Sequence, residues 1–150
     1  MANSSQSSHS SHSSHSSHSS LNQLSPHQLG RAGEAAAVDY LLEAGYSIID
    51  QNWRGSHGEI DIIANDKRAI DLPYELGDSE IVIVEVKTRS SNAFGAPFEA
   101  ITPDKYRRLF LLGREWIAEY HPGAQWRIDV LALICTDGGF RFTHHKGLIA

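Results

Sequence analysis

The stretch "IVIVEVKTR", residues Ile81–Arg89, joins an apolar strand to two charged side chains. Its continuous run of Ile and Val indicates a strand that is buried on both faces. Strand side chains alternate between faces, so Glu85 and Lys87 are expected on the same face as the two isoleucines before them. Same-face neighbours lie roughly 6–7 Å apart along a strand. The spacing therefore predicts that Glu85 and Lys87 do not touch and instead hold one shared ligand.

A second strand, "GEIDIIA" at 58–64, carries a similar anomaly. Alternation predicts Asp61 on one face with Ile63, and Ile60 with Ile62 on the other. Aspartate is depleted in strands, and this one stands among isoleucines. Asp61 is either a solvent-facing acid on an edge strand or part of a functional site.

The first predicted helix carries a third acid at an apolar position. Glu34 falls in register with Val38 and Leu41, on the apolar side of the helix. Gly30 and Gly33 would let this helix approach the sheet closely. Glu34 is either a capping or snorkelling acid, or a third carboxylate of the same site.

The rest of the pattern predicts the fold. Ser25-Pro26 and Thr102-Pro103 each combine a capping side chain with a proline at the first helical position. Asn65-Asp66 has turn chemistry. The predicted helices cover 26–44 and 103–120, and the predicted strands cover 46–54, 58–64, 80–89, 126–135 and 138–145. The order α-β-β-β-α-β-β predicts an α/β fold with a mixed central sheet flanked by helices.

Composition limits the class of protein. The chain has 150 residues, one cysteine and a net charge of −5. The single cysteine excludes a disulfide framework, and the acidic charge argues against a general high-affinity nucleic-acid binder, which usually has a basic surface. A Ser/His-rich segment predicts a disordered tail over residues 1–24, which would chelate metal weakly at most, ahead of one domain over 25–150. Much of the acid lies in one segment, residues 71–80. We expect a cytoplasmic protein without membrane contact, because the apolar runs are short and no secretory signal is present.

Three carboxylates and a lysine at apolar positions are more informative together than singly. Mg²⁺ and Mn²⁺ prefer carboxylate oxygens and usually take one or two of them, with water and substrate phosphate completing the shell. Asp61, Glu85 and the backbone carbonyl of Val86 are the predicted ligands. Lys87 would orient the attacking water or stabilise charge on the phosphate. This layout is typical of metal-assisted phosphodiester hydrolysis.

Asp61 followed by Glu85-x-Lys87 on consecutive strands resembles the PD-(D/E)xK nuclease superfamily, whose core is restriction-endonuclease-like. A glutamate in the first helix, as at Glu34, resembles its Holliday-junction-resolvase-like branch. The blocks "GRAGEAAAVDYLLEAGYSIIDQNWR", "GEIDIIA", "VEVKTR", "FGAPFEAITPDKYRRL" and "RIDVLAL" are together similar to the YraN family of uncharacterised endonuclease-like bacterial proteins. The resemblance covers residues 30–133 with gaps. It implies that four residues are catalytic: Glu34, Asp61, Glu85 and Lys87. The chain departs from it by lacking a proline before Asp61, and by the acidic segment and the tail.

Four basic residues are weaker candidates for contacts with nucleic acid: Arg54, Arg89, Lys105 and Arg108. The arginines at strand ends would equally well solvate those ends. Lys105 falls in register with Leu109, Leu112, Trp116 and Tyr120, the apolar stripe of the second helix, so it is expected to snorkel.

Four other polar residues are not assigned to the site. Asp129 is expected to pair with Arg127, its same-face neighbour on a strand. His57 is expected to be a turn residue, and His144-His145 is assigned no role.

Three functions remain open from the sequence. The first is a Mg²⁺- or Mn²⁺-dependent nuclease that acts on DNA, with branched or structured DNA among the candidate substrates. The second is a non-catalytic nucleic-acid-binding accessory protein of the same fold. The third is an internal ion-pair network without chemistry. A small monomer with this net charge would bind DNA weakly, so the first two predict a homodimer or a DNA-processing partner protein.

Overall fold

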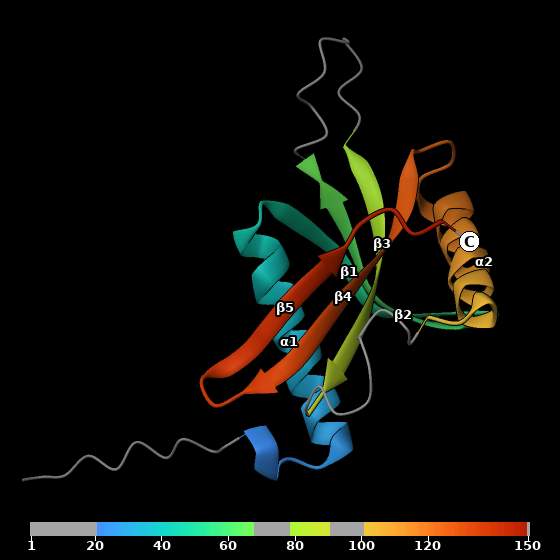
Figure 1. Ribbon diagram of the computed structural model, residues 1–150. Helices are drawn as coiled ribbons and strands as arrows, with labels where there is room; N and C mark the ends of the chain where they lie inside the picture. Colours follow the sequence, from blue (N-terminus) through green and yellow to red (C-terminus); the bar gives the residue numbers. More distant parts are fainter. Residues whose placement is uncertain (1–20, 68–78, 91–100, 150) are drawn as a thin grey trace, which may run out of the picture.

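The described residues, 21–67, 79–90 and 101–149 of this computed structural model, form one mixed sheet between two helices (Figure 1). The elements are a 3-10 helix at Leu21–Gln23, α1 (Pro26–Glu43), β1 (Tyr46–Gly55), β2 (Gly58–Asp66), β3 (Glu80–Arg89), α2 (Pro103–Tyr120), β4 (Trp126–Thr136) and β5 (Gly139–His145). The strands lie side by side in the order β1-β2-β3-β4-β5. Only β3 and β4 are parallel among these neighbours. The predicted fold class and the order α-β-β-β-α-β-β are confirmed.

Both helices begin at the predicted caps. At α1, Ser25 Oγ accepts the backbone N–H of Gln28, and the Gln28 side chain accepts the backbone N–H of Ser25. At α2, Thr102 Oγ1 accepts the backbone N–H of Lys105. These bonds satisfy first-turn donors that have no partner inside the helix, so each helix starts at a defined residue.

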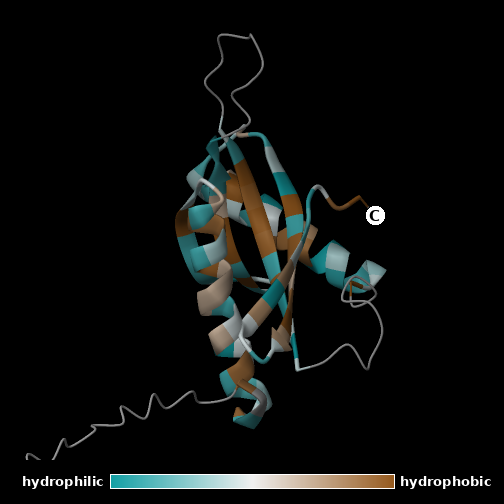
Figure 2. Cartoon of the chain, turned by 60° about the vertical axis from the view of Figure 1, so that its left-hand side comes forward, coloured by the Kyte–Doolittle hydropathy of each residue, from teal (hydrophilic) through white to brown (hydrophobic). Residues whose placement is uncertain are grey.

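The two helices cover opposite faces of the sheet, and each face has its own apolar core. Apolar residues run along the central strands between the helices (Figure 2). The valines of β3 pack in the core beneath α1, while its first two isoleucines pack in the core beneath α2. The strand is thus buried on both faces, as its sequence predicts. The same alternation turns Glu85 and Lys87 toward the α2 side.

Gly33 allows α1 to lie close to the end of β3. A Cβ atom at position 33 would overlap the Thr88 side chain and would lie only 2.8 Å from Thr88 Cβ. Thr88 follows Lys87, and Gly33 precedes Glu34, so this contact fixes α1 against the strand that carries the charges. A Cβ atom at Gly30 would have no described atom within 4 Å. The predicted close approach therefore holds for Gly33 and is wrong for Gly30.

Gly33→Ala is expected to destabilise the protein by roughly 1–3 kcal/mol, because the added methyl group forces α1 away from Thr88. Gly30→Ala is the matched control on the same helix. It is expected to be neutral or stabilising by up to about 1 kcal/mol, since alanine has the higher helix propensity. Urea unfolding of both variants measures the difference. Equal stabilities would contradict the close approach.

The predicted turn at Asn65-Asp66 is wrong. Both residues belong to β2, where Asn65 pairs with Ser47 of β1 and with Ile81 of β3. Ladder pairing on both sides outweighs the local turn preference of these residues. β2 therefore runs two residues further than its sequence suggests.

The predicted alternation of β2 is also wrong. Ile60 packs beneath α2 with Ile63, whereas Ile62 packs beneath α1. The ladder with β3 ends at the pair Ile62–Val84. Asn52 of β1, which lies beside this point, has a left-handed φ of 53°. The backbone turns where β2 parts from β3, which moves Ile60 to the other face.

The apolar stripe of α2 is confirmed except at its end. Leu109, Leu112 and Trp116 are buried, but Tyr120, the last residue of the helix, is 49% exposed. Residues 1–20 of the predicted tail and 71–78 of the acidic segment lie outside the described residues. Neither described helix is long and apolar enough to cross a membrane.

Candidate metal and nuclease site

Asp61 and Glu85 meet where β2 parts from β3. Asp61 Oδ2 accepts the backbone N–H of Val86 at 2.7 Å, next to Glu85 in the chain. The side chain of Asp61 thus replaces the backbone acceptor that β2 no longer offers beyond the pair Ile62–Val84. Both predicted metal-binding carboxylates therefore lie at the same end of the sheet.

Glu85 is the buried centre of this site. Its side chain is 3% exposed, and its Oε1 atom lies 2.8 Å from Lys87 Nζ and 2.9 Å from Lys105 Nζ. Its Oε2 atom is buried without a hydrogen-bond partner among the described residues. A buried acceptor without a partner costs about 1–3 kcal/mol, and more when it is charged. The site therefore has an oxygen that no donor of the described residues satisfies.

The direct contact between Glu85 and Lys87 contradicts the prediction from strand spacing. The spacing of 6–7 Å expected along a strand separates backbone positions. The flexible four-carbon stem of Lys87 spans that distance and brings its ammonium group back to the carboxylate. The two side chains are thus paired directly with each other.

The carboxylates influence one another. Burial, the charge of Glu85 and the charge of Glu34 raise the pKa of Asp61 to about 7 from an ordinary 3.8, although the hydrogen bond from Val86 and the charge of Lys105 oppose this. Glu34 of α1 is therefore close enough for its charge to act on Asp61. The third predicted carboxylate belongs to the same electrostatic cluster.

The residues present fit a Mg²⁺ or Mn²⁺ ion in their chemistry. Among the described residues, no three His, Cys, Asp or Glu side chains form a preassembled metal cage. Mg²⁺ does not need one, since it is commonly held by one or two carboxylates with water and phosphate. The N–H of Val86 points toward Asp61, and the N–H and C=O of one strand residue point to the same side. The Val86 carbonyl is thus directed to the side of the strand where the Asp61 carboxylate lies.

The weaker candidates lie around this end of the molecule. Lys105 does not snorkel as expected, because its ammonium group binds Glu85. Arg54 pairs with Glu59 at 3.0 Å, and its side chain is 84% exposed. Arg108 is exposed on α2 beside Gly58 of the β1–β2 turn. Contact of nucleic acid with Arg54, Arg89, Lys105 and Arg108 stays a prediction.

Comparison with known proteins places the chain in a family. The profile of the uncharacterised protein family UPF0102 matches residues 33–133. The chain belongs to family UPF0102. All four predicted catalytic residues lie inside the matched segment, and so does Lys105. Membership of an uncharacterised family is thereby confirmed, whereas placement in a nuclease superfamily remains a proposal.

Several UPF0102 proteins are similar to this chain over most of their length. The one from Chlorobium phaeobacteroides (strain BS1) is 41% identical over 113 residues, which cover 75% of this chain and 81% of the relative. The one from Bacteroides fragilis is 40% identical over 118 residues, 79% of this chain and 88% of the relative. The one from Pseudarthrobacter chlorophenolicus is 43% identical over 122 residues, 80% of this chain and 84% of the relative.

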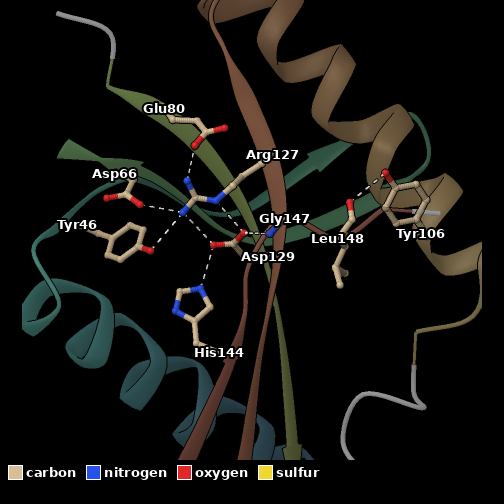
Figure 3. A network of polar contacts seen from close by, with 9 residues as sticks. All are labelled: Tyr46, Asp66, Glu80, Tyr106, Arg127, Asp129, His144, Gly147 and Leu148. Carbon is tan, nitrogen blue, oxygen red and sulfur yellow. Dashed lines mark hydrogen bonds and ion pairs between the residues drawn. The ribbon is translucent and has the colours of Figure 1, made fainter. Parts of the chain in front are cut away.

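A second polar cluster, the Arg127 network, lies on the α1 face of the sheet (Figure 3). Arg127 pairs with Asp129 at 2.9 Å, which confirms the predicted salt bridge. The same guanidinium group also binds Asp66 at 2.9 Å, and it binds Glu80. His144 Nε2 lies 2.9 Å from Asp129 Oδ2. Arg127 also donates to the Tyr46 hydroxyl at 3.2 Å, so the network joins all five strands of the sheet.

Among the contacts that sequence reasoning missed are those of His144 with Asp129 and of Lys105 with Glu85. His144 was assigned no role, yet strand alternation places it on the same face as Phe142, which packs against the α1 core. The missed signal for Lys105 is its position in the first turn of α2, where the helix dipole disfavours a cation. An acidic partner offsets this unfavourable interaction, and here Glu85 is that partner.

Asp61→Asn is expected to stabilise the metal-free protein more at pH 8 than at pH 5. The folded protein holds the Asp61 proton up to about pH 7, whereas the unfolded chain loses it near 3.8. The free energy of unfolding that this proton contributes is fully present below about pH 3.8 and is lost as the pH rises through about 7. Asparagine is neutral at both pH values and still accepts the Val86 N–H. At pH 8 the free energy of unfolding of Asp61→Asn should exceed that of the unchanged protein by on the order of 2 kcal/mol, after allowance for solvent screening of the partly exposed group.

Thermal melting in EDTA at the two pH values measures this difference. Asp39→Asn, on the exposed side of α1, is the control and should change stability by less than about 0.5 kcal/mol. A gain for Asp61→Asn of the same size at both pH values would show that this carboxyl is ionised throughout.

Proposed function

We propose that this protein is a metal-dependent nuclease that hydrolyses phosphodiester bonds of DNA, with branched or structured DNA as the candidate substrate class. The observation that carries the proposal is that Asp61 binds the backbone next to Glu85, while Glu85 pairs with Lys87 through one oxygen and keeps its other oxygen buried without a partner in the described structure. The resemblance of Asp61…Glu85-x-Lys87 to PD-(D/E)xK nucleases points to the same chemistry. A cytoplasmic location belongs to this proposal.

Each residue has a role in the proposed reaction. Asp61, Glu85 and the Val86 carbonyl would hold Mg²⁺ or Mn²⁺, which supplies Lewis acidity and a more acidic bound water. Asp61 must release its proton to serve as a ligand, since ionised carboxylates bind hard cations. Lys87 presents its ammonium group beside Glu85, where it stabilises charge on the phosphate or orients the attacking water. Glu34 adds negative charge that attracts the cation.

Basic residues at this end of the molecule would bind the DNA backbone. Lys105 and Arg108 lie in the first two turns of α2, and Arg89 ends β3. The net charge of −5 limits what one copy of the chain can bind. The proposal therefore includes a second copy of the chain or a DNA-processing partner protein.

The alternative function is that of a non-catalytic accessory protein with a nuclease-like fold. Two observations favour it: the acidic net charge, and the lack of a three-ligand group among the described residues. A purely structural ion-pair network fits less well. Such a network would pair both oxygens of Glu85 and would not raise the pKa of Asp61.

Cleavage assays on single-stranded, duplex, flap and four-way-junction DNA, with Mg²⁺, Mn²⁺ or EDTA, test the proposal. We expect metal-dependent cleavage of at least one substrate. Calorimetric titration of the same protein with Mn²⁺ gives the second measurement. Metal binding without cleavage of any substrate supports the accessory function. No binding at millimolar metal rules out the proposed site.

A further inference from the structure

Lys105 provides a second ammonium group at the site, from an element other than β3. It is the third residue of α2, and its Nζ atom lies 2.9 Å from Glu85 Oε1 with the side chain 26% exposed. A cation in the first turn of a helix is disfavoured by the helix dipole. The side chain crosses from α2 to the sheet and reaches the same oxygen as Lys87. Its position is explained by the charge of the site and not by the helix.

We propose that Lys105 is a phosphate-binding residue that stays on Glu85 while the site holds no metal and moves to the substrate phosphate when a divalent cation binds. The inference rests on the proposed function and extends it by giving Lys105 two partners, Glu85 before the metal binds and the substrate phosphate afterwards. In the metal-free protein, Lys105 serves as a counter-ion.

The charge balance of the site supports this role. Glu34, Asp61 and Glu85 supply three negative charges when ionised, and Lys87 and Lys105 supply two positive ones. A divalent cation changes the net charge from −1 to +1, which matches one phosphodiester. Without Lys105, the metal-loaded site would be neutral. Lys105 therefore supplies the excess positive charge that holds the substrate.

The geometry supports displacement of Lys105. Both lysines share Glu85 Oε1, although the other oxygen of the same carboxylate has no partner in the described structure. Lys105 also acts on Asp61, since its charge lowers the pKa of that group. An ammonium group that faces both proposed ligands is repelled by a divalent cation held between them. The long flexible stem of lysine allows the charge to move several ångströms without movement of α2.

Calorimetric titration with Mn²⁺ in the absence of DNA tests the counter-ion role. Lys105→Met keeps the aliphatic stem and removes the charge, so it is expected to bind Mn²⁺ roughly tenfold more tightly than the unchanged protein. Arg107→Met removes the same charge from the exposed side of the same helical turn. It should change the affinity less than about twofold. Lys105→Arg retains the charge and is expected to bind like the unchanged protein.

The salt dependence of DNA binding, measured with Ca²⁺ in place of Mn²⁺ on a four-way junction, tests the phosphate contact. Lys105→Met is expected to lower the slope of log K against log salt by about 0.9, the value of one phosphate contact, whereas Lys105→Arg should not. If Lys105→Met binds Mn²⁺ with the same affinity as the unchanged protein, the inference is overturned and the proposed function still stands. An unchanged slope would also overturn the inference. Failure of the unchanged protein to bind metal would overturn the proposed function itself.

Discussion

Glu85→Gln is expected to lower the rate of DNA cleavage by roughly 10³-fold or more, while the protein remains folded. Glutamine has the size of glutamate, but it lacks the negative charge that binds a hard cation. It would also lose the charge that holds Lys87 and Lys105 in place. Single-turnover rates at saturating Mn²⁺, on the substrate that the cleavage assays identify, measure the effect. A rate within a few-fold of the unchanged protein would show that the cleavage comes from elsewhere.

Two variants separate the roles within this effect. Glu119→Gln makes the same chemical change at an exposed position near the end of α2 and should leave the rate unchanged. Lys87→Met should lower the rate strongly yet keep Mn²⁺ binding, because it removes no ligand. The melting temperature gives a readout that does not depend on activity. Mn²⁺ should raise it for the unchanged protein and for Lys87→Met but not for Glu85→Gln, since a ligand stabilises only the state that binds it.

The sequence of β3 contained most of what was needed to locate the site. A buried apolar run that ends in Glu85 and Lys87 is unusual enough to predict that the strand leaves the core at a polar site. The same pattern correctly assigned the two faces of the strand, because side-chain alternation is a backbone property that needs no tertiary information. Asp61 was a candidate because an aspartate stands among isoleucines on β2. Alternation did not place it, since the alternation predicted for that strand is wrong.

The contacts of the site were less predictable than its location. Alternation failed at Ile60 because β2 turns where its ladder with β3 ends, and ladder length depends on two strands together. The lysines were misjudged because their long stems reach well beyond their backbone positions. A pattern along one element predicts which face a side chain occupies. It does not predict which atom of another element the side chain will reach.

The Arg127 network shows the same limit on the other face of the sheet. The pair Arg127–Asp129 was predicted because both residues lie on one strand. Asp66, Glu80 and His144 come from three other strands and were not predicted as partners. These residues are far apart in the sequence, and only the fold brings them to the Arg127–Asp129 pair.

This network leads to the second large effect, on stability and not on cleavage. Asp129 is 0% exposed and accepts bonds from Arg127 and from the backbone N–H of Gly147 at 2.9 Å. Burial alone would raise the pKa of Asp129, but the bonds with His144, Arg127 and Gly147 outweigh burial and hold this pKa below its ordinary value. The folded protein thus depends on an ionised Asp129.

Asp129→Asn is expected to destabilise the protein by about 3–5 kcal/mol, because it removes the charge from a buried pair and turns amide hydrogens toward the Arg127 donors. Glu59→Gln is the matched control. It makes the same carboxylate-to-amide change in an arginine pair, Arg54–Glu59, of similar length at 3.0 Å but on the surface. Exposed pairs contribute about 0–1 kcal/mol, so this variant should remain close to the unchanged protein. Urea unfolding at pH 7 compares the two. Similar losses in both variants would mean that burial does not strengthen the Arg127 network. If Asp129→Asn loses much stability and keeps its Mn²⁺ affinity, the Arg127 network stabilises the fold independently of the proposed metal site.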